Sequence, residues 1–148
     1  MASRRTERAN KGEPFSVRFR AATDRAVEAE ARRVRRSKSA IVEALAEEAM
    51  RTRRYPGIAF RGEDAARRPW VIGTGLDVWE ICQMVDEFES VNELVADTQL
   101  TERQVRLALA YREEYPEEID DAIRENRRPA ANWQELFPFV QTQRAIAG

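Results

Sequence analysis

The feature that most constrains the fold is a six-residue segment near the N-terminus, residues 15–20, in which apolar and polar side chains alternate. A period of two is typical of a short β-strand that buries one face. The apolar side chains, which would point to one face, are Phe15, Val17 and Phe19. The polar side chains, which would point to the other face, are Ser16, Arg18 and Arg20.

This strand has no partner close to it in the sequence, because two segments with helical patterns follow it directly. Its partner must come from far along the chain or from a second copy. Burying each of the three apolar side chains yields roughly 1.5–3 kcal/mol, whereas ordering the backbone costs about 1–2 kcal/mol per residue. The burial available to one strand packed on two short helices does not offset that entropy cost, so we predict an obligate homodimer.

The two helical segments occupy residues 23–34 and 40–50. Thr23 is the expected N-cap of the first helix, and residues 35–39 form the turn that follows it. The second helix carries apolar residues at helical spacing, which we expect to face inward. They are Ile41, Ala44, Leu45 and Ala49.

A strand followed by two helices resembles the ribbon-helix-helix DNA-binding superfamily, which includes the Arc and MetJ repressors. The resemblance implies an intertwined dimer, in which two copies of the strand pair antiparallel and enter the DNA major groove. Family members usually have glycine where this chain has Arg35, because the first helix ends in a left-handed residue. A positive φ at Arg35 would therefore cost stability.

The residue types on the outer face of the strand suit base recognition. Arg18 and Arg20 can donate two hydrogen bonds each to guanine O6 and N7, and Ser16 can pair with several bases. Ser37 and Ser39 lie at the start of the second helix, where free backbone N–H groups suit a phosphate, and Lys38 adds a positive charge. The alternative is that these side chains only solvate the protein surface.

Charge divides the chain into two halves. Residues 1–55 carry a net charge of +7 and residues 56–148 a net charge of −8, which gives the overall −1. This asymmetry indicates nucleic acid as the partner of the first half and a basic protein as the partner of the second. Two differently solvated surfaces would produce the same pattern.

Composition excludes several classes of protein. The chain contains no histidine, which is the commonest metal ligand and general base, and it has no phosphate-cradling glycine loop. We therefore predict that it is not an enzyme and needs no cofactor or metal. The lone Cys82 fits a reducing compartment, and no apolar run reaches the roughly 18 residues of a membrane span. We expect a cytoplasmic protein that does not associate with membranes.

Residues 58–61 and 70–72 have the composition of two short strands joined by a polar loop, so we predict a hairpin. Capping-box pairs then mark three short helices, which suggest a helix-turn-helix-like unit. These pairs are Asp77 with Glu80, Ser90 with Glu93, and Thr101 with Gln104. Pro116 begins a fourth helix. The third helix would present both basic and acidic side chains. This mixture leaves two roles open for the unit, the reading of DNA bases or contact with a protein partner.

Several residues in this region resemble the domain-of-unknown-function family 433. The motif of residues 72–79, Ile-Gly-Thr-Gly-Leu-Asp-Val-Trp, keeps Gly73, Thr74, Val78 and Trp79 of the family pattern, but Gly75 replaces an arginine and Asp77 a proline. The resemblance covers residues 56–122. It implies an antitoxin of the VapB type, paired with a PIN-like ribonuclease toxin.

The C-terminal segment, residues 126–148, contains a cluster of large apolar side chains. Its members include Trp133, Leu136, Phe137 and Phe139. Such a cluster docks on the chain's own surface or forms the anchor for a protein partner.

Together these patterns predict a mainly α-helical chain of four parts. They are a disordered basic arm (residues 1–12), a ribbon-helix-helix domain (13–54), a hairpin with a helix-turn-helix-like domain (55–125) and an aromatic tail (126–148). The predicted function is a homodimeric antitoxin that represses its own operon at a palindromic operator and neutralises a toxin with its C-terminal half. The alternative is a stand-alone transcriptional regulator with a C-terminal oligomerisation module.

Overall fold

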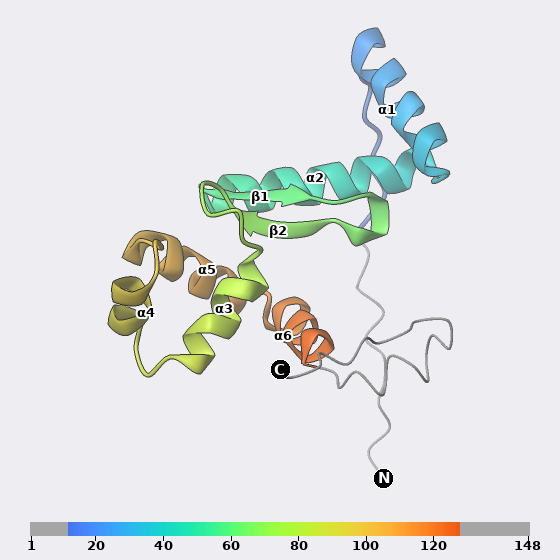
Figure 1. Ribbon diagram of the computed structural model, residues 1–148. Helices are drawn as coiled ribbons and strands as arrows, with labels where there is room; N and C mark the ends of the chain where they lie inside the picture. Colours follow the sequence, from blue (N-terminus) through green and yellow to red (C-terminus); the bar gives the residue numbers. More distant parts are fainter. Residues whose placement is uncertain (1–11, 128–148) are drawn as a thin grey trace, which may run out of the picture. The chain divides into compact units, whose positions relative to one another are not determined.

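The computed structural model describes residues 12–127 of the chain (Figure 1). These residues form six α-helices and one two-stranded antiparallel sheet, which confirms a mainly α-helical fold with a short hairpin. The chain divides into two compact units, residues 1–44 and 45–148, and helix α2 runs through the division. Within the described part of the chain, no helix is long and apolar enough to span a membrane. The predicted ribbon-helix-helix arrangement and domain limits stay predictions.

The first unit contains an extended segment, residues 12–20, followed by α1 (Ala21–Val34) and the start of α2 (Lys38–Arg54). The predicted N-cap at Thr23 is wrong, because the N-cap is Arg20, three residues earlier, and the helix begins at Ala21. Arg20 is extended, and its carbonyl accepts the Asp24 N–H at 2.9 Å. Ala21 and Ala22 favour this earlier start because alanine has the highest helix propensity.

The turn between α1 and α2 is closed by Arg35 in the left-handed conformation, with φ 55° and ψ 43°. The Arg35 N–H donates to the Arg32 carbonyl at 3.3 Å, and the Arg36 N–H donates to the Ala31 carbonyl at 3.0 Å. This pair of hydrogen bonds is the Schellman motif, which normally places glycine at the left-handed residue. The first unit therefore carries an arginine where the backbone favours glycine.

Helix α2 is longer than predicted at both ends. It begins at Lys38 and continues to Arg54 rather than ending at residue 50. Arginines in its last turn favour this extension, since cations stabilise the C-terminal end of a helix dipole. Of the residues expected to face inward, Ile41 is buried, but Leu45 is 49% exposed and Ala49 is exposed. The prediction that these two residues face inward is therefore wrong for the structure of one chain.

The hairpin is confirmed, with β1 at Ile58–Arg61 and β2 at Arg68–Val71. The predicted second strand, residues 70–72, was placed too late, because Arg68 and Pro69 pair with Arg61 and Phe60. A short 3-10 helix, Asp64–Ala66, forms part of the loop. Proline is tolerated in an edge strand because its missing N–H leaves no ladder hydrogen bond unmade.

Four helices follow the hairpin (Figure 1): α3 (Val78–Glu87), α4 (Val91–Asp97), α5 (Glu102–Glu114) and α6 (Pro116–Asn126). Complete capping boxes begin α3 and α5, and the Ser90 side chain caps α4. Pro116 begins α6 as predicted. The caps were readable from the sequence because each depends on residues only three positions apart.

The four helices and the hairpin share one hydrophobic core. Its fully buried side chains include Val78, Ile81, Cys82, Leu94, Val105 and Ala108. Trp79 packs against this core but is only partly buried. Burial raises the pKa of the Cys82 thiol to about 12, so Cys82 stays protonated at neutral pH, as expected for a packing residue.

We predict that Arg35→Gly stabilises the protein. The left-handed conformation costs an L-residue roughly 1–2 kcal/mol. Glycine avoids this cost, but its greater freedom in the unfolded chain lowers the stability of the folded protein by about 0.5–1 kcal/mol. The net gain is about 1 kcal/mol, measured by urea unfolding. Arg36→Gly is the control, because Arg36 does not have positive φ, and it should destabilise. Stabilisation by both variants, or by neither, would contradict this account of the turn.

Candidate nucleic-acid interface and partner surface

The extended segment exposes both of its faces. Phe15 is 86% exposed and Val17 55%, whereas Phe19 is partly buried. No strand in residues 12–127 pairs with this segment. Within the described residues, two large apolar side chains of the predicted buried face are therefore left in solvent.

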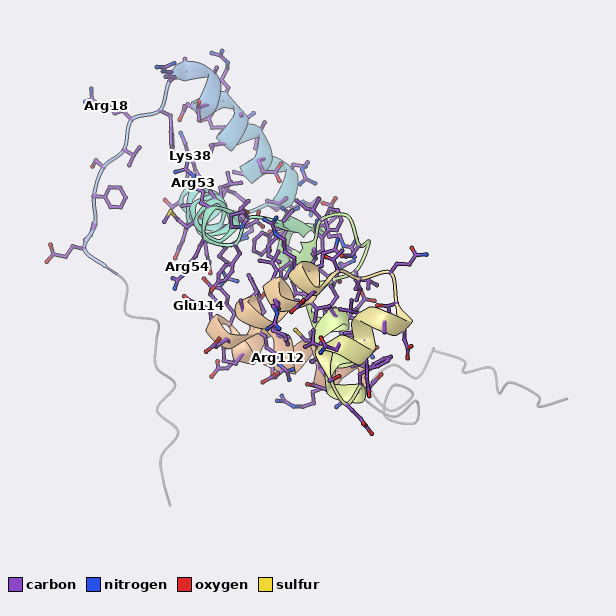
Figure 2. All side chains as sticks on the ribbon, turned by 90° about the vertical axis from the view of Figure 1, so that its left-hand side faces the viewer. Arg18, Lys38, Arg53, Arg54, Arg112 and Glu114 are labelled. Atoms are coloured by element: carbon purple, nitrogen blue, oxygen red, sulfur yellow. The ribbon has the colours of Figure 1, made fainter. Side chains whose placement is uncertain are left out.

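The predicted base-reading side chains belong to the same extended segment. Ser16, Arg18 and Arg20 are all exposed, and Arg18 projects from the extended segment in Figure 2. Two guanidinium groups two residues apart, with a serine beside them, have the donors that could bind guanine in a major groove.

The predicted phosphate-binding residues lie together at the start of α2, but two of them already have partners. The Ser37 hydroxyl accepts the Ala40 N–H at 3.1 Å, so it caps its own helix. Lys38 forms an ion pair with Asp24 of α1. The hydrogen bond from Lys38 to Asp24 raises the pKa of Lys38, so the amine stays charged but is shared with a carboxylate. Ser39 is exposed.

A second polar centre, which sequence reasoning missed, surrounds Arg51 near the end of α2. Its guanidinium donates to the Tyr111 hydroxyl at 2.8 Å and to Glu118 at 2.7 Å. It also pairs with Glu47 and lies 3.9 Å from the centre of the Tyr115 ring. The Arg51 side chain is only 16% exposed. These contacts fasten the last part of α2 to α5 and α6.

The protonation states at this centre are fixed by its contacts. Burial alone would lower the pKa of Arg51, but its hydrogen bonds to Glu118 and Tyr111 outweigh burial and raise that pKa. Burial and Glu118 together raise the pKa of Tyr111. Arg51 is therefore always charged and Tyr111 always neutral near physiological pH, as expected for a structural ion-pair centre.

The arginines of α5 are largely occupied within the unit. Arg106 pairs with Glu102 at 2.7 Å, and Arg112 bridges Asp86 at 2.9 Å and Asp120 at 2.8 Å. Arg54 of α2 pairs with Glu114 at 2.8 Å, and Figure 2 labels both residues. Arg103, the third arginine of α5, is exposed. With two of its three arginines paired to carboxylates, α5 has one arginine left that could contact bases. Of the two roles predicted for this unit, partner contact fits these pairs better.

The predicted partner-binding residues Trp133, Leu136, Phe137 and Phe139 lie outside the described residues, as do residues 1–11 of the predicted arm. Within residues 12–127, no cluster of three or more histidine, cysteine or carboxylate groups is arranged to hold a metal ion. Comparisons with protein-family models, with curated proteins and with solved structures found no match to this chain.

Arg51→Met should destabilise the protein by about 1–3 kcal/mol, because it removes the donor that contacts the buried Tyr111 and the Glu118 carboxylate. The free energy of unfolding in urea measures the effect. Arg53→Met, at an exposed position two residues away on the same helix, is the control and should change stability by less than about 0.5 kcal/mol. Equal losses from the two variants would show that the Arg51 contacts contribute nothing specific.

Proposed function

We propose that the chain is a homodimeric DNA-binding antitoxin that represses its own operon and neutralises a PIN-like ribonuclease toxin. The observation that carries the proposal is the uncovered apolar face of residues 15–19, with Phe15 86% exposed. A soluble chain does not leave such a face in water when a second copy can cover it. Antiparallel pairing of two copies would bury these side chains and supply the missing ladder hydrogen bonds.

Pairing two copies would also build the DNA-binding surface. The two-stranded ribbon would carry Ser16, Arg18 and Arg20 from each chain on its outer face, and such a ribbon fits the major groove. Two-fold symmetry of the protein requires a palindromic operator. The first turn of each α2 would then meet a phosphate through its backbone N–H groups, with Ser39 and Lys38 beside them.

The small core of the first unit supports the dimer on energetic grounds. Among residues 12–44, the buried apolar side chains are Val27, Ala31 and Ile41, with Val34 and Val42 partly buried against them. Three side chains contribute roughly 1.5–3 kcal/mol each, which is small beside the entropy cost of ordering two helices. A second copy would supply the rest of the core.

The toxin-binding part of the proposal rests on the resemblance of residues 56–122 and on charge. The C-terminal half carries a net charge of −8, which complements the basic cleft of a protein that cleaves RNA. Inhibition would be stoichiometric, with carboxylates or the aromatic tail blocking the cleft. If the dimer binds its operator but no toxin co-purifies with it, the alternative function, a stand-alone transcriptional regulator, is favoured over the antitoxin.

Replacing Arg18 and Arg20 with alanine should abolish the preference for operator over unrelated DNA and leave the dimer intact. Each bidentate arginine–guanine contact is worth about 1–3 kcal/mol of discrimination, so the operator preference should fall at least about tenfold. Gel-shift titration against both DNAs measures it. The control, Arg25→Ala with Arg32→Ala, removes the same charge from exposed positions on α1 and should keep the preference. Unchanged preference in the ribbon variant refutes the proposed base contacts.

Asp24→Asn should increase DNA affinity by freeing Lys38 from its ion pair. The matched control is Glu30→Gln, which makes the same change in net charge on the same helix but breaks a pair with Arg33 instead. We expect a larger gain for Asp24→Asn and a steeper loss of affinity with salt, by about 0.9 in logarithmic slope per added phosphate contact. Equal gains for both variants would mean that Lys38 does not reach a phosphate.

A further inference from the structure

An apolar groove lies between the second half of α2 and strand β1. Its apolar lining comes from Leu45 and Ala49 of α2 and from Ala59 and Phe60 of β1. The volume is about 430 Å³, within the range of about 300–1,000 Å³ typical of pockets that take an organic ligand. Leu45 is 49% exposed, so the unit itself does not cover this large apolar side chain.

The groove is held by an ion pair between its two sides. Arg67, in the hairpin loop, donates to both carboxylate oxygens of Glu48 on α2, at 2.8 and 2.9 Å. The same guanidinium donates to the carbonyls of Phe60 at 3.3 Å and Gly62 at 3.1 Å. Because Arg67 already occupies the Phe60 carbonyl, an added β-strand is a poor occupant. The occupant should bring apolar side chains.

The chain itself contains such an occupant beyond residue 127. Trp133, Leu136 and Phe137 follow the i, i+3, i+4 spacing of one helical face, and Phe139 and Val140 come directly after Pro138. Residues 133–140 contain one acid, Glu135, and no cation. The groove rim carries the exposed Arg53 beside Thr52, so its charge complements Glu135.

The connecting chain is long enough for this contact. An extended chain spans at most about 3.3–3.6 Å per residue, so Trp133 reaches about 20 Å from Arg127 and Phe137 about 35 Å. A compact unit of the size of residues 45–127 has a radius of gyration of about 12 Å and hence a diameter of roughly 30 Å. The tail can therefore reach across the unit to which it is attached.

We propose that residues 133–140 dock into the α2–β1 groove of their own chain, with Trp133 and Phe137 against Leu45, Ala49 and Phe60. This contact goes beyond the proposed function, because it requires neither DNA nor a toxin. In the free protein the tail would then be bound in the groove. A toxin that binds the same aromatic side chains would have to compete with the groove for them.

A spin label on the tail tests the contact in the full-length protein. Gln141→Cys places a thiol next to the apolar cluster, and Cys82 does not compete for the label because it is buried and its pKa is raised. In the ¹⁵N-labelled protein, the amide signals of Leu45, Ala49 and Phe60 should be lost and should return when the label is reduced. Signals from α4, which does not line the groove, should persist.

Two variants on adjacent turns of α2 provide the control. Ala49→Arg fills the groove and should restore the lost signals, whereas Ala46→Arg, exposed and outside the groove lining, should leave them broadened. Broadening that is absent, uniform over the protein, or unchanged by Ala49→Arg overturns the proposal. In a mixture of labelled ¹⁴N chains with unlabelled ¹⁵N chains, selective loss of the groove signals would assign the tail to a second copy and likewise overturn it.

Discussion

The N-terminal unit has one unmet requirement, the burial of the apolar side chains of its extended segment at residues 15–19. Phe15 and Val17 are exposed in the single chain, and the core formed by the described residues of the N-terminal unit contains three buried side chains. An extended segment of this length is stable only when its backbone is paired and its apolar face is covered. Both needs would be met at once if a second copy lay antiparallel beside it, so the proposed dimer and the proposed DNA binding depend on the same contact.

Helix α2 serves both compact units. Its first half supplies Ile41 to the core of the N-terminal unit. Its second half is fastened to the C-terminal unit by Arg51, through Tyr111 and Glu118, and borders the apolar groove. The helix therefore carries the proposed DNA-contacting first turn and the groove-lining last turns on one continuous element. Arg51 matters here because it fixes the end of that element to α5 and α6.

The sequence predicted those features that depend on residues close together in the chain. Capping pairs, Pro116 and the first strand of the hairpin were all located from local spacing, and the structure confirms them. The start of α1 was misplaced because a threonine was preferred over two alanines that continue the helix. The second strand was placed late because Pro69 suggested a loop, although an edge strand accepts proline.

The parts that sequence reasoning missed depend on contacts between distant residues. Arg51 reaches Tyr111 and Glu118 across sixty or more positions, and no spacing rule predicts such a contact. Tyr111 itself could have been found by continuing the helical period of Val105 and Ala108. The predicted inward positions Leu45 and Ala49 fit the period but line a groove, because periodicity identifies an apolar face and not what covers it.

The molar mass in solution tests the central claim most directly. Sedimentation equilibrium of the full-length protein should give twice the mass of one chain, and Val17→Asp, which places a carboxylate on the apolar strand face, should shift the mass toward that of a single chain. The matched variant Arg18→Asp, on the opposite face, should remain dimeric. A folded wild-type protein with the mass of one chain, or a Val17→Asp variant as dimeric as the wild type, would contradict the account.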